Sequence, residues 1–374
     1  MLSPDILVLD GQSRSALGVV RSLSQKGLSV IAGSNSASGI ANYSRCIKKY
    51  FTYSYDTDAL EKAHSTILEQ VKILRPKVLM PVMNPSWSII YTFYDDYKHL
   101  TKIVPNPGKD FFDKLFDKSY LAEVSKKHDV PIPKTYMPEN NHNALSLIDE
   151  LPYPVLLKPK KGQGGLGIKR VDEKKGLGNA LSEYDEMPII QELISGEDLE
   201  LTLLCIRGEP IAGSVYLSLR NYPLPYGPPV ACRTINDDYL MDLGINFLRK
   251  LNYNGVAHLD FRRDQNDGEA KLLDFNVRLA GTNEMSICSG IDFGYFLYKL
   301  SIGEKVDQIF EYEIDKEFRW LLFGELRYLI ATSKKWKTIK DMLRWKNVLT
   351  NFSITDPLPS IALVLRKISG LFAK

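Results

Sequence analysis

The residues that first suggest chemistry are a lysine and a cluster of glycines near the middle of the chain. An apolar run over 154–157 ends in Lys158, and four of the six positions 162–167 are glycine: Gly162, Gly164, Gly165 and Gly167. Glycine lets backbone N–H groups turn inward toward phosphate oxygens, and lysine supplies a point charge to a phosphate. The GxxxxGK[ST] pattern of a Walker loop is absent. The segment predicts a phosphate-binding loop of another kind, with a mobile hairpin turn as the alternative.

Two predicted strands further along carry carboxylates and an amide. Strand alternation places Asp274, Asn276 and Arg278 on one face of the second strand, and Asp260 lies on its partner. Carboxylate and amide oxygens are hard ligands that suit Mg²⁺ held jointly by protein and substrate phosphates, and Mn²⁺ is an alternative metal. Bare carboxylates are costly in a strand as apolar as 272–277. A metal site is therefore favoured over an exposed polar strand face.

Two further stretches are less specific. An acidic linker over 192–200 follows a strand, and such a linker can present its backbone to an adenine edge and an acid to ribose hydroxyls. Taken alone, a solvated turn explains it better. Arg220 precedes the proline-rich segment 223–229 and could hold a substrate carboxylate or phosphate in a bidentate way. A surface arginine at a sheet edge is the equal alternative.

Taken in order, Asp117-Lys118, the glycine-rich loop, the acidic linker and the carboxylate hairpin resemble the ATP-grasp superfamily. The likeness is to its carbamoyl-phosphate-synthetase and biotin-carboxylase-like branch and to carboxylate ligases near it, and it covers roughly residues 1–305. The resemblance implies ATP and Mg²⁺ as cofactors, bound between a central lid and a C-terminal domain.

Roles for single residues follow from this resemblance. For the nucleotide it implies Lys118 and Lys158 on the phosphates, the glycines of 162–167 over them, Glu192 and Leu193 at the adenine, and Glu200 (or Glu197) at the ribose. For the metal it implies Asp260, Asp274 and Asn276. It makes Arg278 and Lys158 catalytic residues, with Arg278 facing the γ-phosphate or an acyl-phosphate and Lys158 reaching the α-phosphate and the adenine. Asp274 stands where the family usually has Glu, which leaves open whether one or two Mg²⁺ bind.

The predicted strands and helices that must position these residues form two kinds of sheet. A β-α-β pattern over 6–32 predicts a parallel sheet, and a proline-rich break follows at 105–108. Antiparallel strands follow from 154 onward. The predicted fold is therefore α/β plus α+β: a Rossmann-like domain over 1–108, a lid over 109–190, an antiparallel-sheet domain over 191–310 and a helical basic tail over 311–374. The turn at 11–16 lacks two glycines of the GxGxxG pattern, which argues against NAD.

The composition of the chain excludes several other classes of protein. The chain has 374 residues, 44% hydrophobic and 25% charged, with a net charge of +3, so a dedicated nucleic-acid binder is not expected. Four scattered cysteines and five histidines predict neither a disulfide framework nor a zinc site. The sequence shows no signal peptide and no apolar run of about 18 residues, so a cytoplasmic protein is expected.

The tail differs from the rest in charge. Residues 331–374 contain nine Lys and Arg against two Asp, a net +7, and two of the four tryptophans. Basic residues beside interfacial tryptophans suit anionic headgroups, so peripheral membrane contact through 331–374 is one hypothesis. Helices that simply pack on the core are the alternative. The oligomeric state stays open.

The function implied by the resemblance is an ADP-forming ligase. ATP would phosphorylate a small-molecule carboxylate, and a nucleophile, expected to be an amine, would displace phosphate from the acyl-phosphate. Carboxylase or carbamoyl-phosphate chemistry on bicarbonate is the first alternative, disfavoured because no biotin-carrier Met-Lys-Met sequence or glutaminase domain is found. A nucleotide-binding regulatory protein without turnover is the second.

Overall fold

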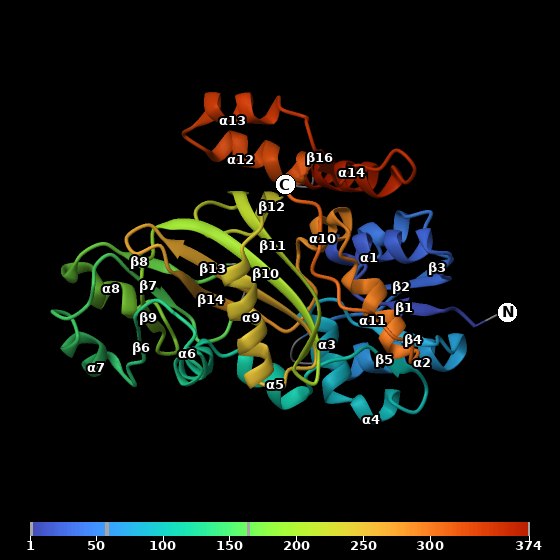
Figure 1. Cartoon of the computed structure of the whole chain (residues 1–374), viewed down its shortest axis with the longest axis horizontal. Helices are drawn as coiled ribbons and strands as arrows, with labels where there is room; N and C mark the ends of the chain where they lie inside the picture. The colour runs from blue at the N-terminus through green and yellow to red at the C-terminus, as the bar shows by residue number, and fades with distance from the viewer. Residues whose placement is uncertain (1–2, 57–59, 163–164, 373–374) are drawn as a thin grey trace.

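The structure is a computed structural model that describes residues 3–56, 60–162 and 165–372 (Figure 1). Three sheets organise these residues. A five-stranded sheet lies at the N-terminal end, a four-stranded sheet forms a lid at the opposite side, and a seven-stranded sheet lies between them (Figure 1). The predicted combination of parallel and antiparallel sheets is confirmed.

The N-terminal sheet is parallel throughout and has the strand order β3-β2-β1-β4-β5. Its central strand β1 is a fully buried apolar run, as a strand covered on both faces requires. The strands are β1 (Ile6–Val8), β2 (Val30–Ser34), β3 (Lys49–Thr52), β4 (Val78–Met80) and β5 (Lys102–Ile103). The helices and turns between them are α1 (Arg14–Gln25), η1 (Ile40–Tyr43), α2 (Leu60–Leu74), α3 (Asn84–Thr92) and α4 (Tyr94–Tyr97).

Helices α5 (Lys109–Leu115) and α6 (Lys118–Lys127) lead from this sheet into the lid. The lid sheet is antiparallel, with the order β6-β9-β7-β8. It consists of β6 (Thr135–Tyr136), β7 (Val155–Lys158), β8 (Lys169–Val171) and β9 (Ile189–Glu192), with α7 (Asn141–Ser146), η2 (Lys174–Gly176) and α8 (Leu177–Leu181). The lid has an apolar cluster of its own, whereas the N-terminal sheet and the seven-stranded sheet share one continuous cluster.

The seven-stranded sheet has the order β14-β13-β10-β11-β12-β15-β16. Its strands are β10 (Gly196–Ile206), β11 (Glu209–Asn221), β12 (Pro229–Thr234), β13 (Gly255–Asp264), β14 (Ala270–Asn276), β15 (Glu317–Arg319) and β16 (Val348–Thr350), and α9 (Asp238–Lys250), α10 (Asn283–Ser289) and α11 (Phe293–Ser301) belong to the same region. The predicted hairpin is present as β13 and β14, and its register sets Asp260 opposite Asp274. Asp260 is also opposite Glu200 of β10, so three acids lie in one row across the sheet.

The C-terminal segment contains η3 (Leu321–Glu325), α12 (Leu326–Ala331), α13 (Lys335–Met342) and α14 (Leu358–Phe372). The expectation of a purely helical tail is wrong at β15 and β16, because β15 pairs with β12 and β16 extends the same sheet. The predicted boundary at 310/311 thus separates two strands from their sheet, and the one at 190/191 falls inside β9. Each strand is only three residues long, too short for period-2 alternation to reveal it.

Buried polar contacts fix this segment to the rest of the protein. Arg21 of α1 donates to the Asp356 carboxylate at 2.8 Å, and Ser44 and the Arg45 amide donate to the same carboxylate at 2.7 and 3.0 Å. Arg319 of β15 is almost fully buried and donates to the carbonyl oxygens of Asp341 and Met342. Residues 311–372 are therefore an integral layer of the fold.

Candidate active site

A cavity of about 240 Å³ lies where the lid meets the seven-stranded sheet. Its walls come from the lid strands β7 and β9, from the central strands β10, β13 and β14, and from the first turn of α1. Of the predicted site residues, the cavity is lined by Lys118, Lys158, Gly162, Gly165, Glu192, Leu193, Glu200, Asp260, Asp274, Asn276 and Arg278. The structure thus brings together most of what the sequence singled out.

Lysines converge at the lid end of this cavity. Lys158 ends β7 and is buried, with its Nζ donating to Gln191 Oε1 at 2.5 Å. Burial lowers the pKa of Lys158 to about 8, although the nearby Asp274 carboxylate acts in the opposite direction. Lys118, at the start of α6, donates to the Gly162 carbonyl at 3.0 Å and lies 3.9 Å from Asp274 Oδ1. A buried ammonium with one neutral partner is a site prepared for an anion.

The glycine-rich loop needs glycine at the positions that can be judged. Gly165 has φ +77°, and a Cβ added there would lie 2.7 Å from the Tyr226 carbonyl oxygen. Gly167 has φ +72°, and its Cβ would meet the Pro159 ring at 2.8 Å. Gly164 lies outside the described residues. The loop therefore packs its backbone closely against Tyr226 at Gly165 and against Pro159 at Gly167, and a side chain at either position would disturb that packing.

The carboxylate wall consists of β13 and β14. Asn276 Nδ2 donates to Asp260 Oδ2 at 3.1 Å, and Arg278 Nη2 donates to Asn276 Oδ1 at 3.0 Å. The buried Arg278 Nε has no hydrogen-bond partner among the described residues. Asp260 and Asp274 remain partly exposed to the cavity, so their oxygens can ligate a cation. This donor set of two carboxylates and one amide fits Mg²⁺ or Mn²⁺.

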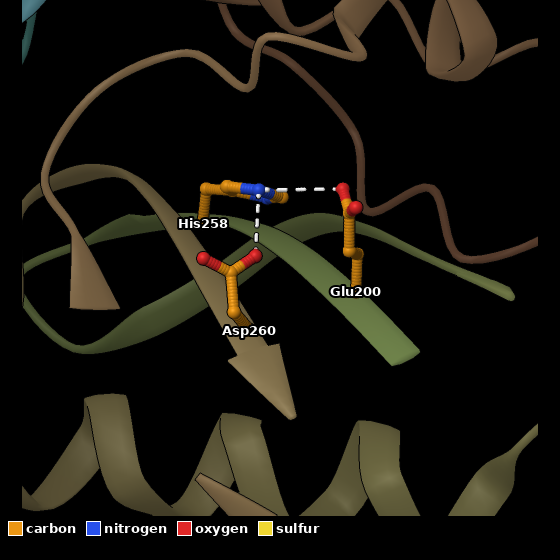
Figure 2. Close-up of side chains that lie close together, drawn as sticks. All are labelled: Glu200, His258 and Asp260. Atoms are coloured by element: carbon orange, nitrogen blue, oxygen red, sulfur yellow. Dashed lines mark ion pairs between the residues drawn. The ribbon is translucent and has the colours of Figure 1, made fainter. Parts of the chain in front are cut away.

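A histidine joins two of the acids in the row. His258 Nε2 lies 3.1 Å from Asp260 Oδ1 and 3.4 Å from Glu200 Oε2. Figure 2 shows the imidazole directed toward both carboxylates. Burial lowers the pKa of His258, but the Asp260 and Glu200 carboxylates outweigh it, and the net shift is upward. Burial raises the pKa of Glu200, which also accepts from Thr282 Oγ1 at 3.0 Å. The three side chains have ligand atoms within 4.8 Å of one another, a spacing that a cation could also use.

Sequence reasoning missed Arg14, which reaches the cavity from the N-terminal domain. Ser13 caps α1 by accepting from the Ala16 amide at 3.1 Å, which places Arg14 in the first turn. The Arg14 guanidinium donates to the Pro229 carbonyl at 3.0 Å and lies 4.2 Å from the centre of the Trp320 ring. Its only sequence signal was its place in the 11–16 turn. Its neighbours there come from segments more than 200 residues away, so local spacing could not reveal them.

Asp198 is a second missed residue. It lies on β10 two positions before Glu200, on the same face of the strand, and lines the cavity. Arg262 Nε donates to Asp198 Oδ1 at 2.6 Å, and Asn221 Nδ2 donates to its other oxygen at 2.8 Å. Glu197, the alternative acid for the ribose, is exposed and does not line the cavity. Of these two acids, Asp198 lines the cavity and Glu197 does not.

Two other predicted residues have partners that limit their roles. Arg220 is buried against Glu325, to which its Nε donates at 2.7 Å, and it does not line the cavity. That position gives it a structural ion pair in place of the predicted substrate contact. The Leu193 amide donates to the Pro154 carbonyl at 3.3 Å, so this N–H is already used within the lid.

Comparisons with known proteins agree with this geometry. A family model described as an ATP-grasp domain matches residues 115–282. The D-aspartate ligase of Enterococcus faecium is 26% identical over 228 residues, 52% of each chain. The alpha-aminoadipate–LysW ligase LysX of Sulfurisphaera tokodaii is 30% identical over 117 residues, 29% of this chain and 41% of that protein. The chain thus spans about half the length, or less, of the curated relatives it matches.

A solved structure extends the likeness in fold. The biotin carboxylase domain of 2-oxoglutarate carboxylase from Hydrogenobacter thermophilus, solved with MgADP, ADP and bicarbonate, superposes with a TM-score of 0.68. It is 16% identical and covers 85% of this chain and 74% of that one. The matched family segment holds both lysines, the glycine-rich loop and the carboxylate hairpin. The family model thus identifies residues 115–282 as an ATP-grasp domain, and the resemblance to the ATP-grasp superfamily predicted from the sequence is confirmed over that segment.

Proposed function

We propose that the protein is an ATP-dependent, ADP-forming ligase that joins a small-molecule carboxylate to an amine through an acyl-phosphate. The observation that carries the proposal is the convergence of cations and carboxylates in one cavity. Lys118 lies 3.9 Å from Asp274. Arg278 donates to Asn276 at 3.0 Å, and Asn276 donates to Asp260 at 3.1 Å. Lys158 and Arg14 line the same cavity. Cations thus lie beside the carboxylates, as the transfer of a highly charged phosphoryl group requires.

In this proposal ATP lies under the lid with its phosphates near the two lysines. Bound Mg²⁺, held by Asp260, Asp274 and Asn276, would neutralise phosphate charge and act as a Lewis acid. A substrate carboxylate oxygen attacks the γ-phosphorus, ADP leaves, and an acyl-phosphate forms. The amine nitrogen then attacks the acyl carbon and inorganic phosphate leaves. Arg278, whose buried Nε has no hydrogen-bond partner among the described residues, would bind the transferred phosphoryl group in this proposal.

The far end of the cavity offers two kinds of charge for the two substrates. Arg14 and Arg278 supply guanidinium groups that can bind a carboxylate. Glu200 and His258, beside the proposed metal set, pair a carboxylate with an imidazole, a wall that suits an amine or ammonium group. The names of the two ligase relatives support this pairing of substrate classes.

The proposal is tested by a screen for ADP release from Mg·ATP over amino acids and other carboxylates, each with and without candidate amines. We expect ADP release that depends on one carboxylate, and a product containing a new amide bond by mass spectrometry. ADP release that requires bicarbonate alone would assign the chemistry to a carboxylase. No release with any acceptor, despite tight ATP binding, would favour a nucleotide-binding regulator.

Arg14 provides the sharper test of how the substrates are arranged. We expect Arg14→Met to raise the KM for the carboxylate at least tenfold while leaving the KM for ATP within about twofold, because the residue lies away from the lid lysines. Arg45→Met, on an exposed arginine outside the cavity, is the matched control. A rise in the KM for ATP alone would place the nucleotide, and not the carboxylate, at Arg14.

A further inference from the structure

A second surface of the protein, unrelated to the cavity, combines exposed apolar side chains with positive charge. We call residues 326–365 the C-terminal layer. In Figure 1, α12 and α13 form the outermost part of the molecule on that side. Of the 23 large hydrophobic side chains exposed in the described residues, 11 belong to this layer: Leu326, Ile330, Trp336, Leu343, Trp345, Leu349, Phe352, Ile354, Leu358, Ile361 and Leu365. A ninth of the chain thus carries nearly half of its exposed large apolar groups.

Helix α13 exposes a large apolar side chain of the kind that a helix covering a core would bury. Its buried residue is Thr338, which is 4% exposed, whereas Trp336 on the same helix is 85% exposed. Leu343, directly after the helix, is 74% exposed. An amphipathic surface helix normally does the reverse, with its apolar stripe inward.

This outward orientation is held by specific contacts. Arg319 donates to the carbonyl oxygens of Asp341 and Met342 at 3.1 Å, which anchors the end of α13 to the sheet. The Thr338 hydroxyl donates to the Lys334 carbonyl at 3.1 Å. The Thr338 bond is internal to the helix, so it is the buried Arg319 that fixes the end of α13 to the sheet, with Thr338 buried and Trp336 and Leu343 exposed.

The charges around these apolar groups have one sign. Asp341 is the one acidic residue between 334 and 346. The same stretch has six basic residues, all exposed: Lys334, Lys335, Lys337, Lys340, Arg344 and Lys346. Interfacial tryptophans beside basic groups match the headgroup region of a bilayer that contains anionic lipids. A second copy of this chain fits less well, because a two-fold contact would oppose the same positive charges.

We infer that the C-terminal layer binds the surface of an anionic lipid bilayer, with Trp336, Leu343 and Trp345 entering the headgroup region. The contact is peripheral, since none of the helices within the described residues is long and apolar enough to cross a membrane. Lys335 and Lys337 flank Trp336 and would lie against the lipid headgroups. The inference is independent of the proposed ligase reaction, which takes place in the cavity.

Vesicle co-sedimentation of the full chain tests it. We expect binding to vesicles of phosphatidylglycerol and phosphatidylcholine at 50 mM salt, and loss of binding at 500 mM salt or with phosphatidylcholine alone. Lys335→Gln with Lys337→Gln should weaken binding about thirtyfold, from about 1 kcal/mol per basic residue near the surface. The matched control is Lys126→Gln with Lys127→Gln, an exposed lysine pair on α6, which should bind like the parent chain.

The apolar contribution is tested separately. Trp336→Ala with Trp345→Ala should also weaken vesicle binding, whereas Ile73→Ala on α2, a residue 62% exposed, should not. Unchanged thermal melting would show that the variants fold, as the exposure of both tryptophans predicts. No binding of the parent chain at 50 mM salt would overturn the inference. Equal vesicle binding by the parent chain and all variants would also overturn it. So would self-association of the parent chain that the tryptophan variant loses, if the parent chain does not bind vesicles.

Discussion

Replacing Lys158 with methionine should make the protein more stable at neutral pH and inactive. Burial lowers the pKa of Lys158 from 10.5 to about 8. At about 1.4 kcal/mol per tenfold change, holding this ammonium in the folded protein costs about 3 kcal/mol at pH 7. The variant removes that cost but leaves Gln191 Oε1 without its donor, which costs about 1–3 kcal/mol. We therefore expect Lys158→Met to be up to about 2 kcal/mol more stable than the parent at pH 7.

The pH dependence of the stability difference between parent and variant tests the buried charge of Lys158 independently of the Gln191 contribution. A lysine whose folded pKa lies below its unfolded value destabilises the folded state fully at pH values below about 8. Between pH 8 and 10.5 the folded protein has released this proton and the unfolded chain has not. The parent chain therefore gains stability relative to the variant across that range, and above pH 10.5 the variant is the less stable of the two.

The assay is denaturant or thermal unfolding of both proteins at pH 7, 8.5 and 10, together with ADP release. Lys126→Met on α6 is the matched control, because that lysine is exposed and should show neither effect. A stability difference between Lys158→Met and the parent that stays constant from pH 7 to 10 would refute the reasoning, since no buried ammonium would then be titrating. Retention of ADP release by the folded variant would refute the role of Lys158 on phosphate.

Three further changes should each affect one part of the molecule. Asp274→Asn should lower ADP release at least about 100-fold with circular dichroism unchanged, because a cation ligand is lost; near-normal release would exclude the predicted site. Gly165→Ala should raise the KM for ATP at least tenfold, since its φ is +77° and its Cβ would meet Tyr226, whereas Gly268→Ala, with φ +75° and open space around it, should not. Asp356→Asn should lower the free energy of unfolding by about 2 kcal/mol, because the buried Arg21 loses the carboxylate at 2.8 Å and its ion pair with Glu284 is longer, at 3.7 Å. Burial acts to raise the pKa of Asp356, but its hydrogen bonds from Arg21, Arg45 and Ser44 outweigh this and hold the pKa below its usual value. The stabilisation of the parent is therefore lost as the pH falls through that lowered pKa, and unfolding at pH 7 and pH 3 checks both.

The local sequence pattern was sufficient to predict the parts of the site that lie on single strands or turns. Lys158 at the end of β7 and the alternation of Asp274, Asn276 and Arg278 are properties of one segment each, so spacing alone placed them. His258 and Glu200 show the limit. Both residues are visible in the sequence, but their pairing depends on the register of β10 against β13, which is set by the whole sheet.

The positions of the remaining residues of the site depend on packing between distant segments of the chain. Arg14 enters the cavity because α1 packs near α10, a contact between segments about 270 residues apart. Arg220 had the residue type of a substrate ligand, but Glu325, a residue of η3, neutralises it in the fold. No pattern within either segment carries this information, because the partner lies far away along the chain.

The separate apolar cluster of the lid has a consequence for the energetics of nucleotide entry. Since the cluster of α7, β7, β8, α8 and β9 is not continuous with the main one, the lid can rotate as a rigid unit about its connections without exposing a shared core. Contacts that would break on such a rotation include the Lys118 bond to the Gly162 carbonyl and the bond from the Lys118 amide to Lys160. Each is worth only about 1 kcal/mol, so these two bonds by themselves hold the lid closed only weakly. The phosphates of the nucleotide, by binding both lysines and the loop at once, would then set the hinge angle.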